Sequence, residues 1–225
     1  QDNLTLLLML PVLLFCDAPF LDIQSPYSVI RSGRHRWVLG QCLYVVFASM
    51  LYPLIIYAAS LIFCLPNLSF STKWGHILKM YSTTFTKEFG ERYKATFMMS
   101  GTVMDAYTPV QATLLTLLLV MLVSVFLGLL ILALNLCFRR VVGLAAASCF
   151  VFLDFFAAWF EEIQGPLGSA VYFISPVSWC NLSNFKNGIE VRPTLPYALI
   201  VLLVLDVLLI LLSVWQMKNR EIEVL

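Results

Sequence analysis

A short basic cluster stands out in a chain that is otherwise unusually apolar. In the stretch SVIRSGRHRWVLGQ, Arg31, Arg34 and Arg36 lie close together, and Trp37 opens a long apolar run. Arginines that flank an apolar run hold a loop on the cytoplasmic side of a membrane, and tryptophan is common at headgroup level. The cluster therefore predicts an anchored cytoplasmic loop rather than a catalytic site.

Two carboxylates lie inside apolar runs, where ionisable groups are rare and costly. Asp154 lies in CFVFLDFFAAWF and Asp206 in VLLVLDVLLILL, and these runs contain no Lys, Arg or His that would neutralise them. Such residues are candidates for a substrate or ion pathway, and a hydrogen bond between helices is the structural alternative. The sequence leaves both interpretations open.

The composition excludes an ordinary soluble domain. The chain has 225 residues, of which 60% are apolar and 12% charged, and its mean hydropathy is +0.88. Soluble domains carry about 25% charged residues and about 45–50% apolar ones. We therefore expect an all-α integral membrane protein that contacts membrane lipids and no nucleic acid, with spans at about 4–20, 38–64, 111–137, 141–160 and 196–216.

The distribution of Lys and Arg sets the expected orientation. Seven positive residues fall in short loops and a short tail on one side of the predicted spans, and seven others are spread over long segments on the other side. The dense side is expected to be cytoplasmic. We therefore expect a multi-pass protein of the cell (plasma) membrane whose C-terminus lies in the cytoplasm. An odd number of spans then puts Gln1 outside, so we expect one further span before it and a six-span parent protein.

Two long segments are expected on the outer side. Residues 66–110 include an aromatic stripe with helical spacing over 70–97, which predicts an amphipathic helix at the interface or on the bundle. In residues 161–195 the helix breakers Gly165 and Pro166 precede an apolar stretch too short to cross. That pattern predicts a re-entrant hairpin, whose irregular backbone must be buried by protein or reached by water.

Motifs for catalysis, metal binding and nucleotide binding are missing from the sequence. There is no HExxH, no GxSxG and no GxxxxGK[ST], and the six cysteines are scattered without a CxxC pair. We therefore expect no catalytic residue, no metal site and no cofactor in this chain. If the protein uses ATP, a partner subunit must bind it.

The region Asp17–Tyr52, DAPFLDIQSPYSVIRSGRHRWVLGQCLYVVFASMLY, resembles the second-to-third-span region of bacterial type-2 ABC transporter permeases. In that family a short cytoplasmic helix between these spans docks on the nucleotide-binding subunit. The order of the later segments is similar as well. An outer segment is followed by the run PVQATLLTLLLVMLVSVFLGLLILALN, a basic turn, a fifth span and a hairpin with SPVSWCNLSNF. The resemblance covers nearly the whole chain.

The resemblance implies a type-2 ABC exporter transmembrane domain with a six-helix fold, of which five spans are visible here. It also implies a homodimer, or a pair of related permeases, with two ATPase subunits that carry ATP and Mg. Transport would proceed by alternating access. The residues implied to couple to the ATPase lie in the segment 21–37 and in the basic turn: Ser25, Pro26, Tyr27, Ile30, Arg31, Arg34, Arg36, Trp37, Arg139 and Arg140.

Small exporters of this kind, including phenol-soluble modulin exporters of Gram-positive bacteria, move amphipathic peptides, so an amphipathic peptide is the expected substrate. Export of a lipid or a drug is an alternative. A membrane anchor or immunity protein that transports nothing would share the spans without needing an ATPase. A secondary transporter is disfavoured, because neither an internal repeat nor charged pairs at the midplane are present.

Overall fold

The computed structural model of the protein describes residues 2–21, 25–67, 73–76, 101–138, 140–164, 171–185 and 192–219. Regular secondary structure in these ranges is helical throughout. In chain order the elements are α1 (Asp2–Leu14), α2 (Ser25–Ser32), α3 (Arg34–Cys64), η1 (Leu65–Asn67), α7 (Gly101–Ala106), α8 (Pro109–Cys137), α9 (Arg140–Gln164), η4 (Val177–Cys180), η5 (Leu182–Asn184) and α10 (Leu195–Asn219).

Three of these helices, α3, α8 and α10, are long and apolar enough to cross a membrane. They contain the ranges 38–64, 111–137 and 196–216 in which the sequence predicts spans. Helix α9 covers the predicted span 141–160 and includes a shorter apolar stretch, Val141–Asp154. With the apolar composition, these helices make the protein an all-helical membrane protein.

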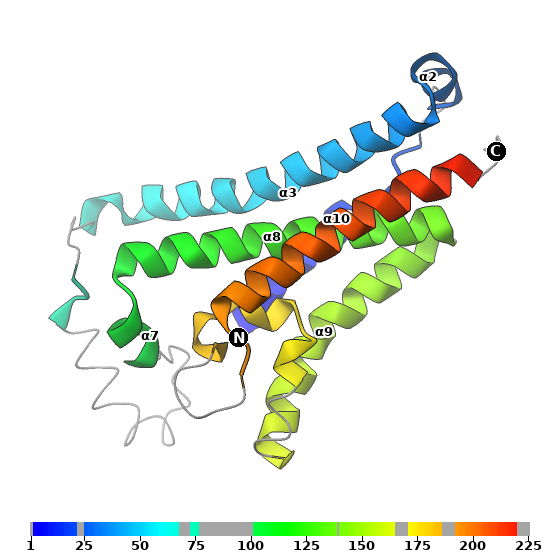
Figure 1. Ribbon diagram of the computed structural model, residues 1–225. Coiled ribbons are helices and arrows are strands. Elements are labelled where there is room, and N and C mark those ends of the chain that lie inside the picture. The colour runs from blue at the N-terminus through cyan, green and yellow to red at the C-terminus, as the bar shows by residue number, and fades with distance from the viewer. Residues whose placement is uncertain are drawn as a thin grey trace.

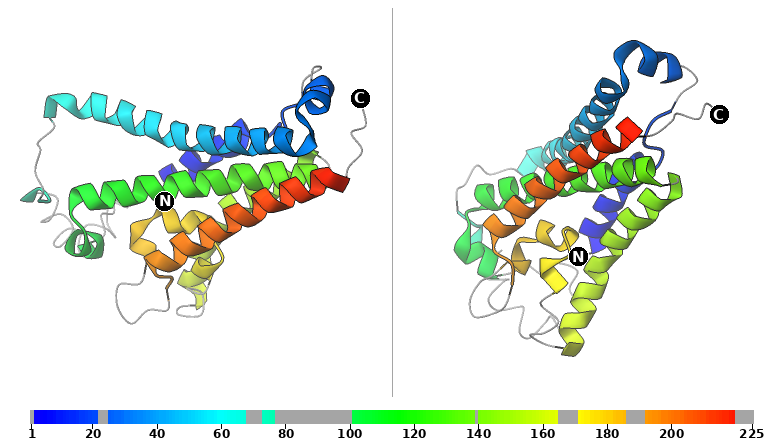
Figure 2. Two further views of the ribbon diagram at one scale, coloured as in Figure 1. Left: turned by 45° about the horizontal axis from the view of Figure 1, so that its top comes forward. Right: turned by 45° about the vertical axis from the view of Figure 1, so that its right-hand side comes forward.

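Helix α8 lies at the centre of the bundle. It contacts α1, α3, α9, α10 and η4, and Figures 1 and 2 show the other long helices arranged around it. In its most apolar stretch 72% of the residues are buried, against 17% for α3 and 22% for α10. The core is therefore built around α8, while α3 and α10 present most of their apolar surface outward.

Two glycines allow the neighbours of α8 to approach it closely. A Cβ atom on Gly128 of α8 would lie 2.6 Å from Cγ1 of Val45 and 2.9 Å from Cδ2 of Phe15. A Cβ atom on Gly143 of α9 would lie 2.6 Å from the backbone oxygen of Ile131. Small residues at such contacts let helix backbones pack closely in a membrane, where burial of apolar side chains gives little driving force.

Helix α1 contains a proline, and a side chain of another helix supplies the hydrogen bond that this proline cannot make. Pro11 has no N–H, so the carbonyl of Leu7, four residues earlier, has no donor within its own helix. The hydroxyl of Tyr52 on α3 donates to this carbonyl at 2.6 Å. The helix ends at Leu14, short of the range 4–20 predicted as a span, and Pro19 disfavours helical backbone at Ala18.

Residues 171–185 form short turns that pack against α8, α9 and α1 through η4. The side chain of Trp179 is 1% exposed, and its Nε1 donates to the carbonyl of Tyr172 at 2.6 Å. Nδ2 of Asn184 donates to the carbonyl of Ser178 at 2.9 Å. Side chains thus supply hydrogen bonds that this irregular backbone cannot make as a helix.

The amphipathic helix predicted over 70–97 lies outside the described residues, except for 73–76. At the end of the segment 66–110, α8 begins with a capping box. The hydroxyl of Thr108 accepts from the N–H of Gln111 at 3.4 Å, and Oε1 of Gln111 accepts from the N–H of Thr108 at 3.2 Å. Pro109 is the first helical residue, where its missing N–H costs nothing.

Candidate functional site

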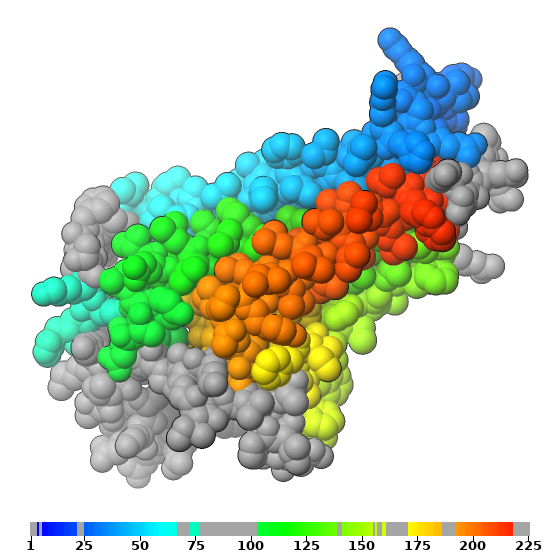
Figure 3. Space-filling model, in the orientation of Figure 1, coloured from blue at the N-terminus to red at the C-terminus, as the bar shows by residue number. Residues whose placement is uncertain are grey.

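Helix α2 stands at one end of the bundle, beyond the start of α3 (Figures 1 and 3). Ser25 and Val29 face the protein and are 8% and 5% exposed, respectively. Tyr27 and Ile30 lie on the opposite face and are 76% and 83% exposed. Exposed apolar side chains that are clustered rather than scattered mark a binding surface. The face that carries Tyr27 and Ile30 is therefore the strongest candidate for a contact with a partner.

A single glycine joins α2 to α3. Gly33 has φ 84°, in the left-handed region that residues with a Cβ seldom adopt. Its N–H donates to the carbonyl of Val29 at 2.9 Å, and its own carbonyl accepts from the N–H of Trp37 at 3.1 Å. Gly33 therefore closes α2, opens α3 and sets the angle between the two helices.

The predicted coupling residues of the segment 21–37 come together around this bend. Arg31 lies in the last turn of α2, Arg34 and Arg36 lie in the first turn of α3, and all three side chains are exposed. Trp37 is half-buried and packs against the core. In the basic turn, Arg140 opens α9 at the same end of the bundle (Figure 1), but its side chain and all of Arg139 lie outside the described residues.

Asp206 of α10 is buried inside the bundle. Its side chain is 7% exposed, and its Oδ1 has no hydrogen-bond partner in the part of the chain that the structure describes. Helix α10 packs against α8 and α3, so the carboxyl group lies between apolar helices. Burying a carboxyl group between apolar helices is costly, which keeps Asp206 a candidate functional residue.

Other polar groups are buried where α3 packs against α8 and α10. The thiol of Cys42 on α3 lies against the hydroxyl of Ser213 on α10. Two helical turns further along α3, the hydroxyl of Ser49 donates to the carbonyl of Ser124 on α8 at 3.2 Å. Asp206 is also two turns from Ser213, in the matching direction for antiparallel helices. The apolar contact of α3, α8 and α10 thus contains buried polar groups at two levels, about two helical turns apart.

Asp154 of α9 is buried on another side of the bundle, next to the 171–185 segment. Its side chain is 4% exposed. Burial and the nearby Asp154 carboxylate both raise the pKa of the Cys180 thiol in η4, so this thiol stays protonated. Asp154 lies ten residues before the end of α9, or about 15 Å along the helix. Residues 171–185 therefore reach well down the side of α9.

Sequence reasoning missed a buried amide that ties three segments together. Asn135 of α8 is 3% exposed; its Nδ2 donates to the carbonyl of Ala18 at 2.6 Å, and its Oδ1 accepts from the N–H of Gly143 at 2.9 Å. A polar side chain near the end of an otherwise apolar run was the available signal. Its partner Ala18 lies 117 positions away in sequence, so the contact itself had no local signature.

The described residues contain no group of three or more His, Cys, Asp or Glu side chains that could hold a metal ion. Comparison with protein-family models, with curated proteins and with solved structures gives no match.

Proposed function

We propose that this chain is the membrane-spanning permease subunit of an ABC exporter and that α2 is its docking helix for a separate ATPase subunit. The observation that carries the proposal is the exposed apolar pair Tyr27 and Ile30 on a short helix outside the bundle. Exposed arginines at 31, 34 and 36 follow that pair in the chain and suit an acidic or polar partner surface. In this proposal the α2 end is cytoplasmic.

The connection between α2 and α3 suggests how a partner's movement would be transmitted. Helix α3 has 31 residues, which gives a rod about 46 Å long. It packs along α8, and Ser49 and Tyr52 tie it to α8 and α1. A displacement of α2 on ATP binding would therefore move α3 as a lever and open or close the bundle at the opposite end.

The proposed cargo is an amphipathic peptide, and two copies of the permease would form the path between them. The buried carboxyl groups of Asp154 and Asp206 are the candidates for gating or lining that path. ATP and Mg would be bound by the ATPase subunits, since this chain has no phosphate-binding motif. Export of a lipid or drug would use the same α2 contact and differ only in the cargo.

Affinity purification tests the proposal. The intact protein, tagged and extracted from its own host in mild detergent, should co-elute with an ATP-binding-cassette subunit, and the complex should hydrolyse ATP. Elution without such a subunit, combined with no ATP turnover in the intact membrane fraction, would favour an anchor or immunity protein and contradict the permease assignment.

A charge-reversal experiment tests the role of the α2 end. Replacing Arg31, Arg34 and Arg36 with Glu should dissociate the ATPase or uncouple its ATP hydrolysis from transport. Lys73→Glu, an exposed change in the outer segment, is the matched control and should leave the coupling intact. Equal coupling in both variants would remove the basic residues from the docking surface.

A further inference from the structure

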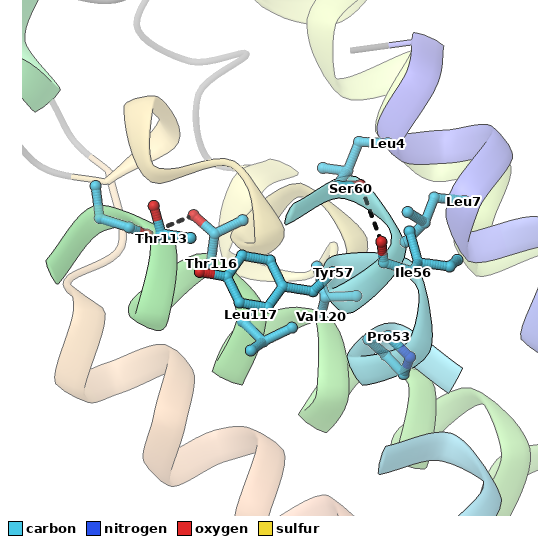
Figure 4. Close-up of a pocket in the computed structure, with 11 residues that line it drawn as sticks. Leu4, Leu7, Pro53, Ile56, Tyr57, Ser60, Thr113, Thr116, Leu117 and Val120 are labelled. Atoms are coloured by element: carbon cyan, nitrogen blue, oxygen red, sulfur yellow. Dashed lines mark hydrogen bonds between the residues drawn. The ribbon is translucent and has the colours of Figure 1, made fainter. Parts of the chain in front are cut away.

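A groove runs between α1, α3 and α8 in the half of the bundle away from α2. Its volume is about 390 Å³, within the range of small-molecule sites. Leu4 and Leu7 of α1, Pro53 of α3 and Leu117 of α8 give it an apolar wall. The hydroxyl-bearing side chains of Tyr57 and Ser60 on α3 and of Thr113 and Thr116 on α8 interrupt this wall (Figure 4).

Three of these hydroxyl groups already donate their protons to backbone carbonyls of their own helices. Ser60 donates to the carbonyl of Ile56 at 2.9 Å, Thr113 to that of Pro109 at 2.8 Å, and Thr116 to that of Ala112 at 2.9 Å. A hydroxyl has one donor and two acceptor lone pairs. Toward the groove, these three oxygens can therefore act only as hydrogen-bond acceptors.

The fourth hydroxyl belongs to Tyr57, whose ring reaches from α3 toward Thr116 on α8 (Figure 4). No hydrogen bond to its phenol oxygen forms among the described residues. No charged side chain lines the groove in the described part of the chain. The site thus combines an apolar surface, several acceptors and one group that both donates and accepts, without an ionic partner for a ligand.

We infer that this groove binds an uncharged single-chain amphiphile from the surrounding membrane, with the ligand's hydroxyl groups donating to Thr113, Thr116 and Ser60. The alkyl chain of the ligand would lie on the leucine and proline side chains. An anion would find one donor and no positive charge, and a cation would find no carboxylate. Because the groove offers mainly hydrogen-bond acceptors and no charge, it favours an uncharged ligand that carries hydroxyl donors. A fatty-acid anion and a simple ester both lack such donors.

This inference goes beyond the proposed function and does not depend on it. A permease, an anchor and an immunity protein could each hold such a ligand, because the groove lies on the described helices of this chain alone. Binding is therefore measured on the isolated chain, with no ATPase and no transport readout.

The test uses photoaffinity labelling of the intact protein in phosphatidylcholine nanodiscs. The probe is an alkyl glycerol monoether with a diazirine in its chain, which supplies two hydroxyl donors. Its dimethyl ether has the same chain and no donor, and a diazirine fatty acid at alkaline pH supplies the anion. We expect the diol to label peptides that contain residues 53–60 and 112–120 about three- to tenfold more than either control, as expected for one or two hydrogen bonds.

Variants assign the preference to the hydroxyl oxygens. Thr113→Val combined with Thr116→Val keeps the side-chain shape and should lower labelling by the diol to the level of the dimethyl ether. Ser60→Ala should give a smaller decrease and serves if the double variant does not fold. Ser148→Ala, which removes a hydroxyl from α9, is the matched control and should change nothing.

Several results would overturn the inference. Equal labelling by the diol and the dimethyl ether would reduce the groove to an unselective lipid contact. Strongest labelling by the fatty-acid anion would contradict the neutral ligand. Unchanged labelling by the diol in the folded threonine double variant would show that the hydroxyl oxygens do not hold it.

Discussion

Helix α8 buries most of its apolar side chains, whereas helix α2 exposes Tyr27 and Ile30. Helix α8 is the most apolar of the three helices that can cross a membrane, yet the largest share of its residues is buried within the bundle. Helix α2 lies outside those helices, yet it exposes Tyr27 and Ile30 almost fully. Lipid would accept the apolar surface of α8 at no cost, so its burial reflects specific packing against the other helices.

This difference separates a structural role from a binding role. Burial of α8 indicates that it organises the bundle. Gly128, the amide of Asn135 and the carbonyl of Ser124 meet specific partners on α3, on α9 and in the segment just after α1. Exposure of the α2 pair makes it a candidate surface for the partner proposed above. Substitutions in the two helices should therefore affect different properties: stability for α8 and its contacts, and association for α2.

The largest effect on stability is expected at Gly143. Gly143→Ala places a Cβ atom 2.6 Å from the backbone oxygen of Ile131, which cannot move without shifting α8. We expect a loss of about 3 kcal/mol in the free energy of unfolding, measured by denaturant titration in detergent. Gly40→Ala is the matched control, because a Cβ atom there meets nothing within 4 Å. Equal stability of the two variants would refute the close α8–α9 contact.

A smaller loss is expected when the buried amide of α8 is removed. Asn135→Leu leaves the carbonyl of Ala18 and the N–H of Gly143 without their partners. The expected cost is about 2 kcal/mol by the same titration, since buried polar groups are left unsatisfied. A variant as stable as the parent would mean that lipid or water replaces both hydrogen bonds, and α8 would lose its role as the organising helix at this end.

The smallest stability effect is expected at the hydrogen bond that compensates for a proline. Tyr52→Phe removes the donor to the carbonyl of Leu7 and should cost about 1 kcal/mol. In a Pro11→Ala background the restored N–H can satisfy that carbonyl, so Tyr52→Phe should then cost much less. A double-mutant cycle measures this coupling. Equal costs in both backgrounds would contradict the compensation.

The helices themselves could be predicted from the sequence more readily than their arrangement. The apolar runs around 38–64, 111–137 and 196–216 located the three long helices, because the length needed to cross a bilayer is fixed. Which of them is central could not be predicted, because side chains that face lipid and side chains buried in the bundle are both apolar. Periodicity therefore gave no signal for α8.

For the candidate site, too, the sequence located the segments, whereas the structure was needed to show their contacts. The segment 21–37 was predicted from its basic cluster and from the family resemblance, and the structure adds which face of α2 is exposed. The sequence placed Asp154 and Asp206 in apolar runs and left their roles open, and the structure adds that both side chains are buried. The contacts of Asn135 and Tyr52 join residues 117 and 45 positions apart, so no local pattern could reveal them.

The most direct test of the proposed function compares two exposed apolar pairs at opposite ends of α3. Tyr27→Ser with Ile30→Ser alters α2, and Ile62→Ser with Phe63→Ser alters residues that are 65% and 86% exposed at the far end. The measurement is the amount of ATPase subunit that co-purifies with each variant. The account predicts loss of the ATPase only from the α2 variant, at unchanged stability. Equal retention of the ATPase by both folded variants would contradict it.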